Sequence, residues 1–580
     1  MDRNAIIGIA LAIGLFILAS SMQKNRPPAP APAETPATEA VESATPAPAP
    51  VVPTPAPAPA ETVAPAPVEV QTVPEETHAL ENAAVSYVFT NQGGGVAFLE
   101  LRHHQGAQPG EIMTLNRGAA FPIGALTLKP DAPRNDAWTV AAVQADRIVY
   151  QSETGSVAVE KTYTLHADPE GQYRLMLEIA FTNQSAGPLE YPSYFLFTGQ
   201  AGQLHANDFP HHIGFDYFAG GGNNFVKTSW FTPGFLSKFG IGNPVAKPFY
   251  AQSPGNVDWV GVRGQYFTTM ILPEMPGKGV WARPVDLKVE EAEVKGIEGF
   301  LEMPGFRLEP GATERFQFTL YTGPANLQQM QALGRNATAM MNMDRMWITR
   351  TVGNLLLRAM DTIHGFISKW TWIEKWSWAL SIIILTFIVR GLLWPLQGKA
   401  NRSMKLMQQL MPKQTELREK YKDDPARMNQ EVMKLYKEYG VNPVGGCLPM
   451  LIQIPIFIGF YSMLGTAVEL RNAGFLWISD LSRPDTVAVI AGFPINILPL
   501  LMSATMIWQM RITPKAGDPM QQKMMMFMPV VFILFMYNFA SALALYWTVS
   551  NLLSVLQLYV TRNQPMPELV KKNAPPKKRK

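Results

Sequence analysis

Hydrophobic and polar positions follow two different patterns along this chain. Between about residues 80 and 335, apolar and polar residues alternate in short runs such as "AVSYVFT", "SVAVEKTYTLH" and "RFQFTLYTG", with Gly, Asn and Pro between them. Period-two alternation indicates strands that bury one face. We therefore predict a large antiparallel β-sandwich domain at 79–338.

Long apolar segments lie at the N-terminus and beyond residue 376. Those beyond residue 376 predict transmembrane helices at 374–398, 444–466, 493–511, 524–538 and 541–561. The last two come from one uncharged stretch, which as a helix of 1.5 Å per residue is far longer than the roughly 30 Å hydrocarbon core. It must turn back on itself, and we place the turn near residues 538–541.

The N-terminal segment at 1–22 contains a shorter apolar run, "AIIGIALAIGLFILAS". It can be a cleaved signal peptide or a retained transmembrane anchor. We favour the anchor because no good cleavage site follows directly. Residues 23–78 are rich in Pro and Ala and predict a disordered tether.

Two further helical segments are expected between the β-domain and the later spans. Residues 341–373 are amphipathic and predict an interfacial helix, although a soluble helix packed on the sandwich is the alternative. Residues 399–441 predict a helical hairpin, in which Asp424 caps and Pro425 starts the second helix.

The placement of charge predicts the topology. Basic residues outnumber acidic ones between 398 and 445, and the tail at 562–580 ends in "KKNAPPKKRK". The positive-inside rule makes both cytoplasmic. Counting the spans then places the N-terminus and the C-terminus in the cytoplasm and the β-domain outside. The single cysteine, Cys447, excludes an intrachain disulfide.

The residues argue against several kinds of chemistry. The chain has no phosphate-binding loop motif, and no Asp or Glu lies within the apolar stretches at 376–397, 446–466, 493–510 and 524–560, which weakens nucleotide-driven and ion-coupled transport. We see no nucleophile constellation and predict a protein that is not an enzyme and has no cofactor. The pairs His103–His104 and His211–His212 can offer metal ligands, but loop histidines at the surface are the favoured interpretation and no metal is expected.

One charged residue interrupts an apolar segment. Arg390 lies in "LTFIVRGLLWPL", where a guanidinium costs roughly 2.5–3.5 kcal/mol at the bilayer centre. Uncharged polar residues lie at similar depth on three predicted helices: Thr386, Gln397, Gln453, Ser550, Ser554 and Gln557. They can line a wet groove open to the cytoplasm. Alternatively, Arg390 extends to the interface and the others make ordinary interhelical hydrogen bonds.

The motifs "LTFIVRGLLWPL", "NPVGGCLPMLIQIPIFIGFYSML", "DPMQQKMMMFMPVVF" and "LALYWTVSNLLSVLQ" resemble the YidC/Oxa/Alb family of membrane protein insertases, in its Gram-negative form with a large periplasmic domain. The resemblance implies a bacterial inner-membrane protein with six transmembrane helices, five of which form the insertase core. It also implies that Arg390 lies in a hydrophilic substrate groove. It further implies an apolar surface that contacts the substrate, which we call the slide. This surface corresponds to Ile454, Phe457, Tyr461, Tyr546 and Trp547.

The expected partners are newly made membrane proteins, the lipid bilayer and the Sec translocon. The hairpin and the basic tail can bind a ribosome or simply attract anionic lipid, and no specific nucleic acid is expected. This chain has "FASA" and Tyr546–Trp547 where the family often has a Pro-Ser-Gly turn and two tyrosines. The competing hypotheses are a small-solute transporter or channel and an envelope scaffold that works through its β-domain.

Overall fold

The computed structural model describes residues 74–108, 110–131, 137–166, 171–205, 208, 210–233, 245–341, 347–441, 448–513, 527, 529–534, 536–562, 569 and 571. These residues belong to one unit of the chain, Thr72–Lys580. The predicted anchor at 1–22, the tether up to residue 73 and most of the basic tail lie outside the described residues.

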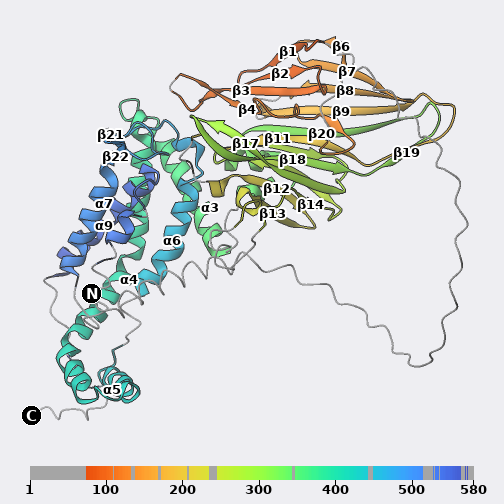
Figure 1. Ribbon diagram of the computed structural model, residues 1–580. Coiled ribbons are helices and arrows are strands. Elements are labelled where there is room, and N and C mark those ends of the chain that lie inside the picture. Colours follow the sequence, from red (N-terminus) through yellow and green to blue (C-terminus); the bar gives the residue numbers. More distant parts are fainter. Residues whose placement is uncertain are drawn as a thin grey trace, which may run out of the picture. The chain divides into compact units, whose positions relative to one another are not determined.

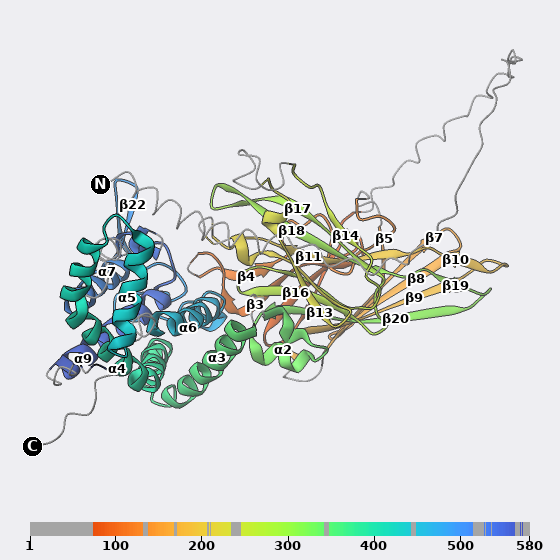
Figure 2. The same cartoon turned by 90° about the horizontal axis from the view of Figure 1, so that it is seen from below.

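Antiparallel sheets form the first half of the described chain, as Figures 1 and 2 show. One sheet has the order β1-β2-β3-β4, a second has the order β13-β12-β15-β16-β20-β9-β8-β7-β6, and a third has the order β14-β17-β18-β11-β5. The strands are β1 (Thr77–Glu81), β2 (Val85–Thr90), β3 (Gly95–Gln105), β4 (Ile112–Leu115), β5 (Leu126–Thr127), β6 (Thr139–Val143), β7 (Arg147–Thr154), β8 (Val157–Leu165), β9 (Arg174–Asn183), β11 (Tyr194–Ala201), β12 (Gly214–Ala219), β13 (Gly222–Lys227), β14 (Tyr250–Gln252), β15 (Val257–Arg263), β16 (Phe267–Pro273), β17 (Gly279–Val289), β18 (Ala292–Met303) and β20 (Thr313–Pro324), and the pair β10 (Leu189–Tyr191) and β19 (Phe306–Leu308) forms a separate ribbon.

The predicted antiparallel β-sandwich is confirmed. Aromatic and branched apolar side chains, among them those of Tyr87, Phe181 and Trp259, fill one core between the sheets. Strand β8 illustrates the alternation, because its residues are buried at every second position along most of its length. Strand β1 begins at Thr77, inside the segment that the sequence assigns to the tether.

One inward position of β8 holds a lysine in place of an apolar residue. The fully buried Nζ of Lys161 donates hydrogen bonds to the carbonyl oxygens of Gly93 at 2.9 Å, Gly94 at 3.1 Å and Gly124 at 2.9 Å, and it lies 4.1 Å from the ring centroid of Trp138. These carbonyls belong to loops next to β3 and β5. Lys161 therefore joins β8 to two loops of the sandwich.

The chain leaves the sandwich through α2 (Leu327–Leu333). Two short 3-10 turns, η2 (Pro210–His212) and η5 (Ala337–Met341), lie in the same domain. The buried Arg263 of β15 donates a hydrogen bond to the carbonyl oxygen of Met340, and its guanidinium lies 3.4 Å from a carboxylate oxygen of buried Asp216. Arg263 thus fixes the point from which the chain continues toward the helices.

Helices form the second half: α3 (Trp347–Ile367), α4 (Ser377–Lys420), α5 (Pro425–Glu438), α6 (Leu448–Leu464), α7 (Ile497–Ile512) and α9 (Ser541–Arg562), preceded or joined by η6 (Glu374–Trp376) and η8 (Val468–Leu470). Residues 527, 529–534 and 536 are also helical. By length and hydropathy, two of the described helices are long enough to cross a membrane, and the apolar helices at Gln453–Leu464 and Ile497–Ile512 are shorter.

The structure joins two elements that the sequence separates. The sequence predicts a transmembrane helix at 374–398 and, separately, the first helix of a hairpin at 399–441. In the structure both belong to α4, which continues for 44 residues through Pro395 and Pro412. The sequence becomes polar after residue 398, but the helix does not end there. The second hairpin helix begins as predicted, since Oδ1 of Asp424 accepts a hydrogen bond from the backbone N–H of Arg427 and Pro425 occupies the first turn.

The start of the predicted span at 493–511 also differs. Residues Phe493–Asn496 form strand β22, which pairs with β21 (Thr486–Ile490), and helix α7 begins only at Ile497. Ala491 and Gly492 join these strands with positive φ angles, which a two-residue hairpin turn requires. Further on, residues 537–540 form the turn that the long uncharged stretch predicted.

Candidate functional site

Arg390 contacts a polar group on another helix. It lies on α4, and its Nε donates a hydrogen bond of 2.6 Å to Oγ of Ser550 on α9. Ser550 is buried, whereas Arg390 is partly accessible. None of the ion pairs among the described residues involves Arg390, so its charge has no carboxylate partner there.

A second polar contact lies one helical turn away. Ser550 follows Tyr546 by four residues on α9, so both side chains share a helix face. Nε2 of Gln453 on α6 donates a hydrogen bond of 2.8 Å to the hydroxyl of Tyr546. Helices α4, α6 and α9 thus meet around Arg390, Ser550, Gln453 and Tyr546, which we call the polar cluster.

The other predicted groove residues have separate partners. The hydroxyl of Thr386 donates to the carbonyl oxygen of Ile382 within α4, and that of Ser554 donates to the carbonyl oxygen of Ser550 within α9. Nε2 of Gln557 donates to the carbonyl oxygen of Trp394 at 3.0 Å, which is a second polar contact between α4 and α9. Gln397 is partly buried on α4.

Tyr546 belongs to the polar cluster and is not on an exposed apolar face. Only 2% of Tyr546 is exposed, and its ring stacks on that of Phe460 with centroids 3.9 Å apart. The resemblance to the insertase family had placed it on the slide. Its spacing of four residues from Ser550 was the signal that could have placed its hydroxyl in the cluster.

The other slide residues lie on α6 and α9. The ring of Trp547 contacts those of Phe457 and Phe532, with centroids 4.8 Å and 5.1 Å away. Ile454 is 45% exposed. The hydroxyl of Tyr461 hydrogen-bonds to Nε2 of His211 in the β-domain at 3.0 Å, so its polar end is already occupied.

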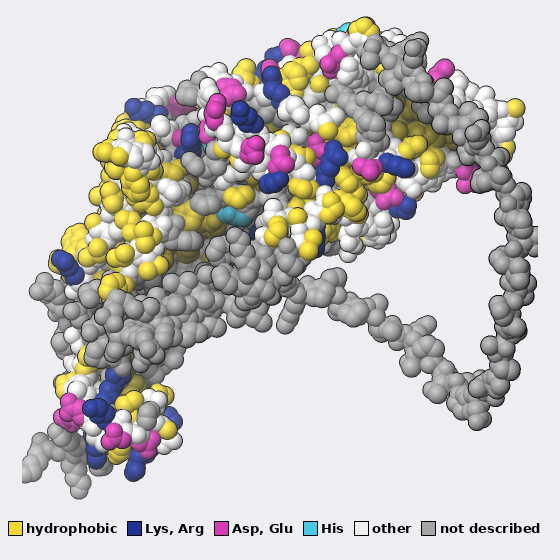
Figure 3. Space-filling model, viewed as in Figure 1, with side chains coloured by type: hydrophobic (Ala, Val, Ile, Leu, Met, Phe, Trp, Pro, Cys, Tyr) yellow, Lys and Arg dark blue, Asp and Glu magenta, His cyan; other side chains and the backbone are white. Residues whose placement is uncertain are grey.

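Apolar side chains cover the outer surface of these helices. Figure 3 shows hydrophobic atoms gathered over the helical part. The exposed side chains include Ile384, Phe387, Ile388 and Leu392 on α4 and Leu552, Leu556 and Val560 on α9. A surface of this kind is typical of a protein that contacts lipid. The polar cluster therefore lies behind an apolar exterior.

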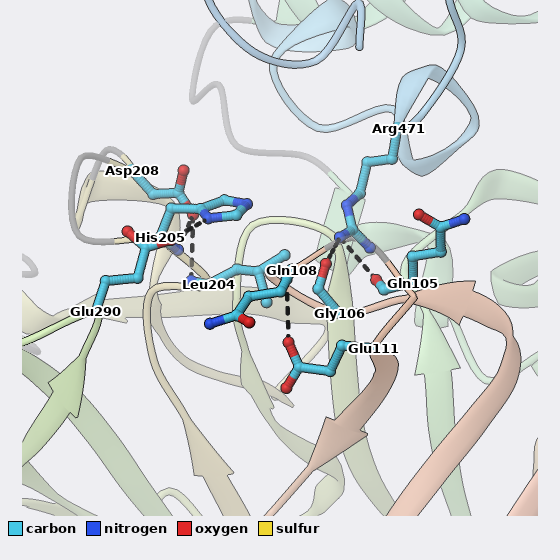
Figure 4. Close-up of polar contacts among 9 residues, drawn as sticks. All are labelled: Gln105, Gly106, Gln108, Glu111, Leu204, His205, Asp208, Glu290 and Arg471. Atoms are coloured by element: carbon cyan, nitrogen blue, oxygen red, sulfur yellow. Dashed lines mark hydrogen bonds and ion pairs between the residues drawn. The ribbon is translucent and has the colours of Figure 1, made fainter. Parts of the chain in front are cut away.

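The β-domain contains a separate hollow of about 920 Å³, partly drawn in Figure 4. Gln108 and Glu111 border it beside β4, and Glu290 borders it beyond β17. Close by, Nη2 of Arg471 from the segment after α6 donates hydrogen bonds to the carbonyl oxygens of Gln105 at 2.9 Å and Gly106 at 3.2 Å. This contact joins the β3–β4 connection to the helical part.

The paired histidines lie in structured elements. His103 is exposed on β3, while His104 is partly buried, with its ring 5.2 Å from that of Phe267. His211 and His212 lie in η2, and His212 is buried, so surface loops are the wrong description for this pair. Burial lowers the pKa of His104 and that of His211 to about 4. No group of three or more metal-ligating side chains occurs among the described residues.

Comparisons with known proteins cover both halves of the chain. Residues 369–568 match the family described as 60Kd inner membrane protein, and residues 77–348 match the YidC periplasmic domain. The membrane protein insertase YidC of Syntrophus aciditrophicus (strain SB) is 31% identical over 513 residues, which are 85% of this chain and 86% of that protein. That of Syntrophobacter fumaroxidans is 40% identical over 309 residues, or 52% and 53% of the two chains.

A crystal structure of an active YidC insertase with its first transmembrane domain resolved aligns at 16% identity with a TM-score of 0.34, over 85% of this chain and 94% of that one. An overlap this low adds nothing to the argument, and the assignment rests on the sequence matches. Membrane-protein substrates and the lipid bilayer are the partners that follow from it. The chain belongs to the YidC family of inner-membrane protein insertases, in its Gram-negative form with a periplasmic domain, and is not an enzyme.

Proposed function

We propose that the chain inserts newly made proteins into the inner membrane through a groove between α4, α6 and α9 that opens to the cytoplasm. The polar cluster is the wall of this groove. It shortens the apolar barrier that a polar tail of the substrate has to cross. No bond is made or broken, because the free energy comes from burying the apolar side chains of the substrate in lipid, at roughly 25 cal/mol per Å².

The observation that carries this proposal is the uncompensated charge of Arg390 among the described residues. Its Nε bonds to the neutral hydroxyl of Ser550, and no carboxylate among the described residues compensates its charge. A guanidinium has five N–H donors. Its two terminal nitrogens can therefore receive a carboxylate of the substrate, in the bidentate geometry that such pairs favour.

The apolar slide accepts the transmembrane segment of the substrate. Ile454, Phe457 and Trp547 form its surface on α6 and α9, beside the polar cluster. Tyr461 lies at the end of α6 that contacts the β-domain. A segment that moves along these side chains passes from the groove into lipid.

The proposed topology has six spans: residues 1–22, the first part of α4, α6, α7, the segment at 524–538, and α9. Both termini and the hairpin of α4 and α5 are cytoplasmic. The Sec translocon and the ribosome are proposed partners, the ribosome through the hairpin and the basic tail. Deletion of 571–580, followed by ribosome co-sedimentation at graded salt, tests the role of the tail.

Insertion assays in cells depleted of the native insertase test the groove. Arg390→Ala should lose insertion of single-span substrates with acidic tails, and Arg390→Lys should retain part of it because the charge remains. Arg511→Ala, at the end of α7, is the matched control. If both Arg390 variants insert acidic-tailed substrates as well as the wild type, the electrostatic role is wrong. Ion and solute flux in vesicles would instead favour a channel.

A further inference from the structure

The β21–β22 hairpin carries apolar side chains on both faces. Opposite residues of an antiparallel pair share a face, so Ile490 lies with Phe493 and Val489 lies with Pro494 on the other side. Val489 is 66% exposed, Ile490 64% and Phe493 57%. A hairpin that faces water on one side shows polar residues there. Residues 486–497 contain no charged residue, so neither face is suited to water.

The backbone along the edge of β22 is also suited to apolar surroundings. Pro494 has no N–H to satisfy, and its carbonyl oxygen accepts a hydrogen bond of 2.6 Å from the hydroxyl of Tyr537. The backbone N–H of Asn496 donates to the same hydroxyl at 3.3 Å. Lipid cannot supply hydrogen bonds, so a strand edge close to hydrocarbon needs such internal partners.

Buried polar contacts hold the hairpin to the start of α7. Oδ2 of Asp485 accepts hydrogen bonds from Nε1 of Trp477 at 3.0 Å and from the backbone N–H of Leu498 at 2.7 Å. Nδ2 of Asn496 donates to the carbonyl oxygen of Tyr537 at 2.7 Å. The hairpin is therefore a rigid continuation of α7.

The length of α7 sets the depth of the hairpin. Its 16 residues extend for about 24 Å, less than a hydrocarbon core of about 30 Å. The four residues of β22 add about 13 Å. The turn at Ala491 and Gly492 thereby reaches the headgroup layer, where water can satisfy the edge of β21.

We propose that this hairpin binds lipid at the boundary between acyl chains and headgroups, in the leaflet remote from α5. The lipid-facing surface, which we call the outer patch, consists of Leu476, Trp477, Val487, Val489, Ile490 and Phe493. Figure 1 places β21 and β22 at the opposite end of the helices from α5, and Figure 3 shows hydrophobic atoms at that end. Lipid is the occupant because α7, which follows the hairpin directly, also exposes apolar side chains such as Leu500 and Leu501, and because tryptophan is typical of this depth.

Fluorescence quenching in vesicles tests the proposal with the full chain. Cys447→Ser removes the single native cysteine, and Ile490→Cys then carries an environment-sensitive label. Val143→Cys is the matched control, because Val143 is a similarly exposed apolar residue on the edge strand β6 of the sandwich. The protein is placed in phosphatidylethanolamine and phosphatidylglycerol vesicles without any substrate.

Nitroxide lipids, spin-labelled at the headgroup or high on the acyl chain, should quench the label at residue 490 several-fold more than the label at residue 143. Aqueous iodide should show the reverse order. If iodide quenches both labels equally and nitroxide lipids quench neither, the patch faces water and the proposal fails. If lipid quenching at residue 490 disappears as the protein-to-lipid ratio rises, a second copy of the chain is the preferred occupant, which also overturns it.

Discussion

The Nε atom of Arg390 and the Oγ atom of Ser550 lie 2.6 Å apart, although the two residues are 160 positions apart in the sequence and lie on different helices. This bond determines the direction of the guanidinium plane. The terminal nitrogens therefore point in a defined direction, which in the proposed groove is set before a substrate arrives. A preoriented charge binds a carboxylate at a lower entropic cost than a freely moving one.

Ser550→Ala should slow the insertion of acidic-tailed substrates by roughly tenfold, because a hydrogen bond to a charged group contributes about 1.5 kcal/mol or more. The double variant Arg390→Ala/Ser550→Ala should be no slower than Arg390→Ala alone, since the two residues act as a unit. Ser554→Ala is the control, because its hydroxyl bonds within its own helix. Additive losses would show that Ser550 acts independently of Arg390.

Lys161→Met should lower the free energy of unfolding of the β-domain by roughly 3 kcal/mol, because three buried carbonyl oxygens lose a charged donor and only those of Gly94 and Gly124 keep a second one, the hydroxyl of Tyr163. Denaturant titration of the full chain in detergent measures this change. The control is Lys295→Met, which removes only an exposed pair with Asp286 and should have little effect. Equal stability of the two variants would contradict a cross-linking role for Lys161.

The stability of the β-domain should fall as the pH is lowered from 6.5 toward 4. Burial holds the pKa of His104 at about 4 against 6.5 in the unfolded chain, so the unfolded chain binds more protons in this window. His104→Gln should reduce this loss by about 1 kcal/mol between pH 7 and pH 5, after allowance for partial exposure. Thermal unfolding at the two pH values measures it. An equal loss of stability in the wild type and in His104→Gln would show that His104 does not account for the pH dependence.

Arg471→Ala should loosen the contact between the β3–β4 connection and the segment after α6. The backbone carbonyls of Gln105 and Gly106 lose their donor, so hydrogen–deuterium exchange in peptides covering 101–108 and 465–483 should rise several-fold. Arg471→Lys keeps one donor and should give an intermediate rise. Arg307→Ala breaks an exposed ion pair with Glu309 and is the control. Unchanged exchange in Arg471→Ala would mean that other contacts hold this junction.

Local sequence patterns predicted much of the fold. The alternation in β8, the cap at Asp424 and the turn at 537–540 depend on residues close together in the chain, and each is present. The order of the strands could not be predicted in this way. Strand β20, for example, lies between β16 and β9, and that position depends on contacts between distant segments.

Within the candidate site, composition identified Arg390 but not its partner. Any of several polar residues on three helices could have met the guanidinium, and only the packing of α4 against α9 selects Ser550. Lys161 was overlooked for a similar reason, because a lysine at an inward position looks like a break in the pattern. The partners that make its burial possible are backbone carbonyls, which a sequence does not display.

Pro395 is a point at which the long helix α4 can bend. A proline inside a helix removes one hydrogen bond and allows bending at that point. It follows Arg390 by five residues and precedes the hairpin that the end of α4 forms with α5, so it separates these two parts of one continuous helix. Nε of Arg390 bonds to Ser550 before this proline, so the contact does not depend on the direction that α4 takes beyond it. One continuous helix thus carries the arginine of the proposed groove on one side of Pro395 and the hairpin on the other.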